Sequence, residues 1–74
     1  MATRTFTAIL EREGDGYVAL GPEFDISSQG DSLEHAKANL AEAVELFLET
    51  ADPAEITSRL HSEVFVTHLE VAVA

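Results

Sequence analysis

The sequence predicts a two-layer α+β domain of the order βββα(α)β, in which one antiparallel or mixed sheet is covered by one long helix. Three observations predict this class. Apolar and polar side chains alternate with a period of two over residues 3–12 and again over residues 63–73. Between them, residues 33–50 contain no Gly or Pro and repeat their apolar side chains every three or four positions. A chain of 74 residues has room for one core, so we expect a single domain over residues 1–74.

The long helix is expected over residues 32–50. Its apolar side chains share one face, and they are Leu33, Ala36, Leu40, Ala43, Val44 and Phe47. The opposite face is mostly acidic. Asp31 or Ser32 can cap the first turn, because a short side-chain oxygen accepts from an amide left unpaired there. Asp31 with Glu34 forms an acidic variant of the capping box. At 1.5 Å per residue the helix is about 27 Å long, enough to cover one face of a small sheet.

Three strands are expected before the helix, over residues 3–12, 17–20 and 24–28, and they form a meander. The Gly14–Gly16 turn separates the first two strands, since glycines around an Asp supply the positive φ angles of a tight hairpin. Pro22 ends the second strand, because proline has no amide to donate to a neighbouring strand.

Two elements are expected after the helix: a short helix over residues 53–60, with Pro53 in its first turn, and a strand over residues 63–73. One face of this last strand should lie toward the long helix, and it carries Phe65, Thr67, Leu69, Val71 and Val73. The other face is apolar where it starts. We expect Val64, Val66 and His68 to lie in an interface between copies of the chain. The last strand can pair with the first within one chain or between two chains, and the pattern leaves both open.

Charge and composition restrict the partners. The net charge is −10, from 14 acidic and 4 basic residues, and no Cys is present. Phosphate backbones are bound through Lys and Arg, so direct binding of nucleic acid is not expected. An acidic surface suits a basic protein partner, or it only keeps a small domain in solution. Such a domain buries about 60% of its unfolded surface, which favours a homo-oligomer. With no signal peptide and no apolar membrane-spanning stretch, we expect a cytoplasmic protein.

The residues that could carry chemistry form no recognised site. The three histidines, His35, His61 and His68, are not at the spacing of zinc ligands, so no metal and no cofactor are expected. Glu23 and Asp25 are the most plausible carboxylate pair for acid–base work. Carboxylates of small acidic proteins are, however, usually only solvated. We therefore expect that the chain is not an enzyme.

The order of these motifs resembles the HicB-type antitoxin family, whose members are small partners of HicA toxins. The residues that carry the resemblance span nearly the whole chain: Glu11, the Gly14–Gly16 turn, Tyr17-Val18-Ala19, Pro22-Glu23, Ser28-Gln29-Gly30-Asp31-Ser32, Glu42-Ala43-Val44-Glu45-Leu46 and, more loosely, Val64-Phe65-Val66-Thr67 and Glu70-Val71. The chain departs from many relatives at Gly21, where they carry Cys, and in the shorter Glu23-Phe24-Asp25 turn.

The resemblance implies a fold similar to a truncated ribonuclease H, a dimer or higher oligomer, and an antitoxin function. The chain would bind a small basic RNA-cleaving toxin and mask its active site. Nuclease activity of its own is not expected, because residues 5–10 hold no metal-binding carboxylate. The DNA-binding domain of many relatives is not expected either. Candidate toxin contacts are Glu23, Phe24, Asp25, Gln29, Glu34 and Glu45. The alternative is an orphan oligomeric interaction or regulatory module without a toxin partner.

Overall fold

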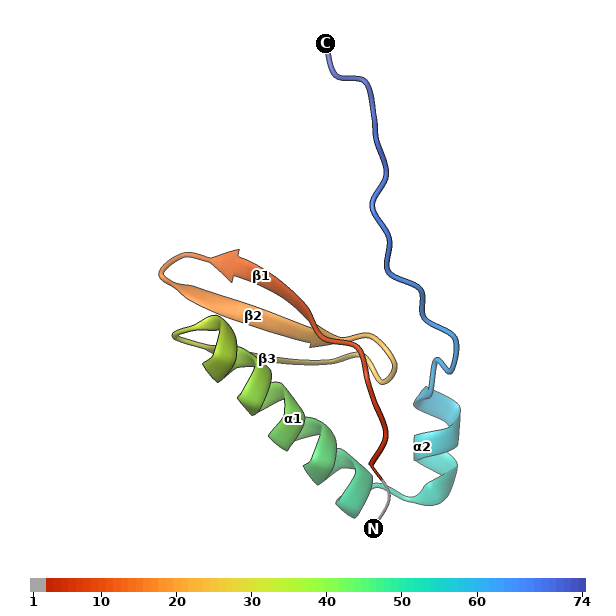
Figure 1. The fold of residues 1–74 in the computed structure, drawn as a ribbon. Helices are drawn as coiled ribbons and strands as arrows, with labels where there is room; N and C mark the ends of the chain where they lie inside the picture. Colours follow the sequence, from red (N-terminus) through yellow and green to blue (C-terminus); the bar gives the residue numbers. More distant parts are fainter. Residues whose placement is uncertain (1–2) are drawn as a thin grey trace.

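In the computed structural model, which describes residues 3–74, a three-stranded antiparallel sheet lies against one long helix (Figure 1). The strands β1 (Ile9–Glu13), β2 (Gly16–Gly21) and β3 (Ile26–Gly30) pair in chain order. The helix α1 (Leu33–Thr50) follows, and then the short α2 (Pro53–Arg59). The α+β class, the meander and both helices are therefore confirmed. Within residues 3–74, neither helix is long and apolar enough to cross a membrane.

The strand register decides which side chains face α1. Leu10 lies opposite Ala19 on β2, and Ala19 lies opposite Ser28 on β3. Side chains alternate between the two faces of a sheet, so these three share one face. Helix α1 covers this face mainly over β2 and β3, and it reaches β1 only slightly. The opposite face carries Ile9 and Leu20, which remain 39% and 38% exposed.

The core is small and is built between α1 and the middle of the sheet. Its buried members are Ala19, Phe24, Ala36, Leu40 and Val44. The Phe24 ring packs between two other aromatic rings in tilted orientations, with centroid distances of 5.5 Å to Phe6 and 5.2 Å to Phe47. Such tilted pairs add to the hydrophobic gain of burial. The predicted apolar face of the helix is confirmed at its centre, whereas Leu33 in the first turn is 47% exposed.

Helix α1 begins with a capping arrangement centred on Ser32. The Ser32 side chain accepts from the backbone amide of His35 at 3.0 Å. The His35 ring in turn accepts at Nδ1 from the backbone amide of Asp31 at 3.2 Å. The box therefore pairs Ser32 with His35, and not Asp31 with Glu34 as the sequence suggested. The His35 amide, which the first turn leaves without a helical partner, and the Asp31 amide just before the cap are both satisfied in this way.

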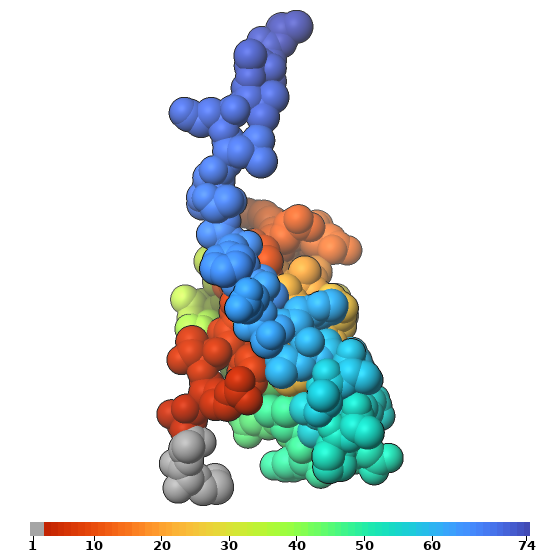
Figure 2. All heavy atoms as spheres, turned by 90° about the vertical axis from the view of Figure 1, so that its right-hand side faces the viewer, coloured from red at the N-terminus to blue at the C-terminus, as the bar shows by residue number. Residues whose placement is uncertain are grey.

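The predicted strand over residues 63–73 is wrong for the single chain. From Leu60 to Ala74 the chain forms no helix or strand, and it extends away from the domain in both views (Figures 1 and 2). Phe65 is 85% exposed and Leu69 is 78% exposed, so this face does not lie against α1. A strand requires a neighbour to pair with, and this segment leaves the domain without one. We call residues 62–74 the C-terminal arm.

The other boundaries differ more modestly. The first strand starts at Ile9, because residues 3–8 have no strand partner, and it ends at Glu13. The third strand runs two residues later than expected, and α2 ends one residue earlier. The connection over residues 22–25 accounts for the shift of β3, since Asp25 has a positive φ of 55° that ends the turn just before the strand.

Gly30 provides a test of how closely α1 approaches β3. A Cβ atom at this position would lie 2.5 Å from the amide nitrogen of Ala36 and 2.8 Å from the carbonyl carbon of His35. These are backbone atoms, so the whole helix start would have to shift. We expect Gly30→Ala to lower the free energy of unfolding by about 1–3 kcal/mol, measured by urea titration.

Gly21→Ala is the matched control, because its Cβ would meet Leu40 at an ordinary 3.5 Å. It should leave stability nearly unchanged or raise it slightly. Equal losses for the two variants would contradict the close packing described at Gly30.

Candidate protein-binding surface

Four carboxylates form a stripe on the side of α1 that points away from the sheet. We call it the acidic helix face, and its members are Glu34, Glu42, Glu45 and Glu49, all exposed. They lie opposite the buried Ala36, Leu40 and Val44. Glu42, Glu45 and Glu49 follow one another at spacings of three and four residues, which return to the same side of a helix. Glu34 lies about two turns before Glu42, and the exposed Lys37 stands between them in the sequence. At 1.5 Å per residue the stripe is about 22 Å long.

This arrangement is electrostatically unfavourable for an isolated chain. Glu45 and Glu49 are one turn apart, where like charges repel. The last turn of α1 contains Glu49 and no basic residue, although the negative end of the helix dipole favours cations there. Packing of the apolar face against the sheet holds the helix, and so keeps these carboxylates near one another despite their repulsion. A cationic partner would reduce both the repulsion between the carboxylates and the unfavourable interaction of Glu49 with the helix dipole. The acidic helix face is therefore suited to bind positive charge.

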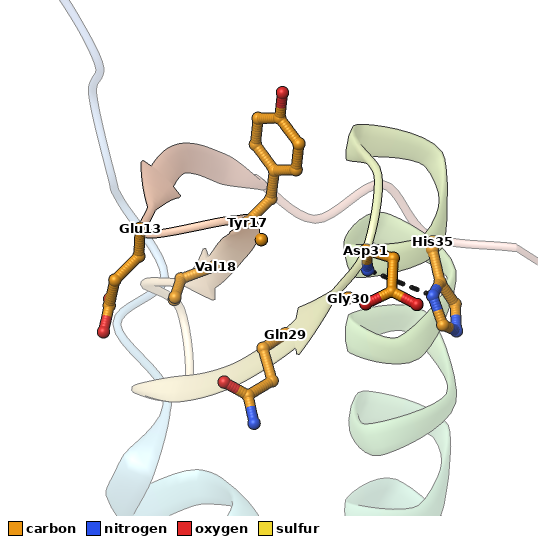
Figure 3. A pocket seen from close by; sticks show the side chains of 8 residues that line it. Glu13, Tyr17, Val18, Gln29, Gly30, Asp31 and His35 are labelled. Atoms are coloured by element: carbon orange, nitrogen blue, oxygen red, sulfur yellow. Dashed lines mark hydrogen bonds between the residues drawn. The ribbon is translucent and has the colours of Figure 1, made fainter.

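A shallow hollow adjoins the start of this stripe, where the β1–β2 hairpin meets the first turn of α1 (Figure 3). The labelled side chains around it are those of Glu13, Tyr17, Val18, Gln29, Asp31 and His35. The backbone carbonyl of Gln29 accepts from Asn39 Nδ2 at 2.8 Å, which joins β3 to the helix and leaves the Gln29 side chain exposed. The hollow therefore presents the Gln29 amide and the carboxylates of Glu13 and Asp31. The strand and helix that carry Gln29 and Asn39 are joined by a hydrogen bond.

The turn between β2 and β3 lies at the opposite end of the sheet and is held by polar contacts. The Glu23 carboxylate accepts from the Thr7 amide at 3.1 Å and from Thr7 Oγ1 at 2.7 Å. The Glu23 carbonyl accepts from the His61 amide at 2.7 Å, and the His61 ring lies 3.2 Å from Asp25 Oδ2. The turn thus fastens both the N-terminal segment and the start of the C-terminal arm.

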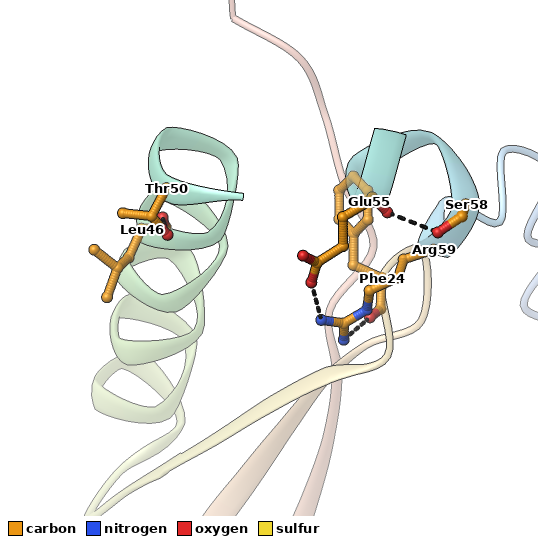
Figure 4. A network of polar contacts seen from close by, with 6 residues as sticks. All are labelled: Phe24, Leu46, Thr50, Glu55, Ser58 and Arg59. Atoms are coloured by element: carbon orange, nitrogen blue, oxygen red, sulfur yellow. Dashed lines mark hydrogen bonds and ion pairs between the residues drawn. The ribbon is translucent and has the colours of Figure 1, made fainter. Parts of the chain in front are cut away.

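Helix α2 is attached to the same turn through Arg59 (Figure 4). Its guanidinium donates to the Phe24 carbonyl at 2.6 Å and lies 4.7 Å from the centroid of the Phe47 ring. Glu55, one turn earlier, lies 4.0 Å from the same guanidinium. Arg59 is therefore occupied within the fold and serves to hold α2 against the domain.

The hydrogen bonds at Glu23 change its acidity. Partial burial alone raises the pKa of its carboxyl group. Donation from the Thr7 side chain and from the amides of Glu23 and Thr7 outweighs that effect, and the pKa lies below its ordinary value. Glu23 is consequently held in its charged form by contacts within the domain.

The six predicted toxin contacts are not brought together. Phe24 is only 3% exposed and belongs to the core, so it is not part of a surface. Glu23 is partly buried and engaged with Thr7, and Asp25 lies beside it on the turn. Gln29 and Glu34 lie near the other end of the sheet, and Glu45 lies farther along α1. Glu34 and Glu45 both belong to the acidic helix face, at its start and in its second half.

Sequence reasoning did not select Glu42 and Glu49 as site residues, although their helical spacing from Glu45 was a sufficient signal. Of the predicted interface residues, Val64 is partly buried, whereas Val66 and His68 are exposed on the C-terminal arm. Their role between copies stays a prediction. Residues 3–74 contain no group of three or more His, Asp or Glu side chains that could hold a metal ion.

The lowered pKa of Glu23 predicts a pH dependence of stability. A carboxylate whose pKa is depressed by folding stabilises the fold above its unfolded pKa, and this contribution is lost as pH falls through the folded pKa. Stability should therefore decline on acidification below about pH 4.5, the ordinary value. Glu23→Gln should reduce stability near neutral pH and flatten this decline, measured by thermal unfolding across pH. The exposed Glu49→Gln is the control, and an equal flattening there would contradict the assignment.

Comparison with known proteins adds no relative to this description. No model of a protein family, no curated protein and no solved structure matches the chain. The interpretation of its surface therefore rests on the residues and on the geometry given above.

Proposed function

We propose that the chain is an antitoxin-like module that binds and neutralises a small basic RNA-cleaving toxin of the HicA type. The observation that carries the proposal is the acidic helix face, a rigid stripe of four exposed carboxylates on a chain of net charge −10. The ordered motifs that resemble HicB-type antitoxins point to the same function. A truncated ribonuclease-H-like fold, a homo-oligomer and a cytoplasmic location belong to this proposal.

The physical basis is competition for the same cations. A protein that cleaves RNA binds the phosphate backbone through Lys and Arg side chains. The carboxylates of the acidic helix face pair with those side chains, so the toxin binds either RNA or this chain. Complementary charge also accelerates the encounter and rejects acidic partners. The hollow beside Gln29 and His35 lies at one end of the stripe and offers hydrogen-bonding groups for specificity.

A second candidate is an orphan oligomeric interaction or regulatory module. The observation that favours it is the C-terminal arm, whose exposed apolar side chains are suited to self-association. This candidate requires no toxin, and the acidic helix face would then act mainly in keeping the oligomer in solution.

The test begins with a search of the reading frames beside the gene of this chain for a small basic protein, which is then purified as the toxin. We expect the intact chain to bind it and to stop its cleavage of RNA. Glu34→Lys combined with Glu45→Lys should weaken binding by roughly tenfold or more, because two pairing charges are reversed. The weakening should be largest at low salt, measured by calorimetry and by RNA cleavage.

The matched control is Glu11→Lys with Asp15→Lys, which changes the net charge by the same amount at exposed positions of the β1–β2 hairpin, outside the hollow. It should weaken binding far less. Equal weakening by the two pairs would show that only total charge matters and would contradict a role of the acidic helix face. Absence of binding by the intact chain would contradict the antitoxin function and favour the orphan module.

A further inference from the structure

The C-terminal arm carries the pattern of a strand but is exposed to water in the single chain. Phe65, Leu69, Val71 and Val73 alternate along it and are 85%, 78%, 68% and 90% exposed. Burial of large apolar side chains is the dominant favourable term in folding and association. An extended segment with this exposure on one face therefore requires a surface to cover it.

The domain offers one such surface at β1. The sheet order β1-β2-β3 leaves β1 at an edge, with backbone groups available to a further strand. The side of β1 toward α1 is also incompletely covered, since Leu10 is 36% exposed. A strand added there would satisfy the free backbone groups and shield Leu10.

The length of the arm and the charge of this edge are compatible with pairing. Residues 63–73 form a longer segment than β1 (Ile9–Glu13), so the arm can pair along the whole of that strand. The edge segment, residues 3–13, contains Arg4 and Arg12 together with Glu11 and Glu13, and the arm contains Glu63 and Glu70. The edge segment is neutral overall, so an acidic arm can approach this part of a chain of charge −10 with little repulsion.

The way the arm begins indicates whether it pairs with β1 of its own chain or with β1 of a second copy. His61 is fixed at the β2–β3 turn by its amide and its ring. Val64 is still partly buried, and beyond it the arm extends away from β1 and α1 (Figure 1), with its outer part projecting past the rest of the molecule (Figure 2). A second copy is the occupant that presents the same edge and the same arm, so the contact can be made twice about a two-fold axis.

We propose that two copies exchange C-terminal arms, each arm pairing with the β1 edge of the partner and completing a four-stranded sheet. The exchange leaves both acidic helix faces exposed, and it does not depend on the toxin-binding function. Val66 and His68 then lie in the interface between the copies. Salt strengthens this dimer, because it screens the repulsion between two chains of the same charge.

The test is the mass of the full chain in solution, compared with two matched Leu→Asp variants. The native chain should have twice the 8.0 kDa of one copy at micromolar concentration by light scattering. Leu69→Asp should raise the dissociation constant of the dimer by roughly thirtyfold or more. Leu46→Asp is the control, since Leu46 is an exposed Leu of α1, outside the arm. It should leave the dimer unchanged, and circular dichroism should show both variants folded.

Hydrogen exchange of the amides in residues 3–13 separates arm exchange from other dimers. They should be protected in the native dimer and exchange faster in Leu69→Asp. A monomeric native chain would overturn the proposal, including one whose edge amides are protected because the arm pairs with its own β1. A dimer sensitive to Leu46→Asp and not to Leu69→Asp would also overturn it. So would a dimer in which the edge amides remain unprotected.

Discussion

The close approach of α1 to β3 is the constraint on which the rest of the structure depends. It is possible because Gly30 has no side chain and because Ala19 and Ala36, which meet between the layers, are small. Their small size brings Leu40 and Val44 into contact with the sheet. In a domain of 74 residues this narrow contact is most of the core, and its position over β2 and β3 leaves β1 partly uncovered.

The same contact determines which surfaces are available for binding. With Ala36, Leu40 and Val44 turned to the sheet, the carboxylates at the opposite side of α1 are directed to solvent. Their mutual repulsion is tolerated because burial of the other face holds the helix. The polar turn around Glu23 has a complementary role, since it gathers Thr7, Arg59 and His61 and so fixes where the arm leaves the domain. The acidic helix face and the exposed apolar C-terminal arm therefore lie on different parts of the molecule.

The sequence was sufficient for the class, the meander and the long helix, because these depend on local periodicity and turn residues. Leu40 and Val44 could be assigned to the core from spacing alone. The strand over residues 63–73 could not be placed, since alternation identifies a segment that can pair but not the partner that it requires. The pattern at Phe65 and Leu69 describes a strand whose neighbour the single chain does not provide. The anchoring role of Glu23 depends on its contact with Thr7 across the fold, which no local pattern reports. The capping role of His35 is local, but the usual capping-box residues favoured Glu34 in its place.

The central claim is that one chain is an incomplete sheet that a second copy completes, while the acidic helix face remains free. The most direct measurement is an isotope-filtered nuclear Overhauser spectrum of an equal mixture of labelled and unlabelled full-length chains, which reports only contacts between different copies. The account predicts contacts between the side chains of residues 63–73 of one copy and those of residues 3–13 of the other. Absence of these contacts from the filtered spectrum, with the same contacts present in the unfiltered spectrum of one labelled chain, would contradict it.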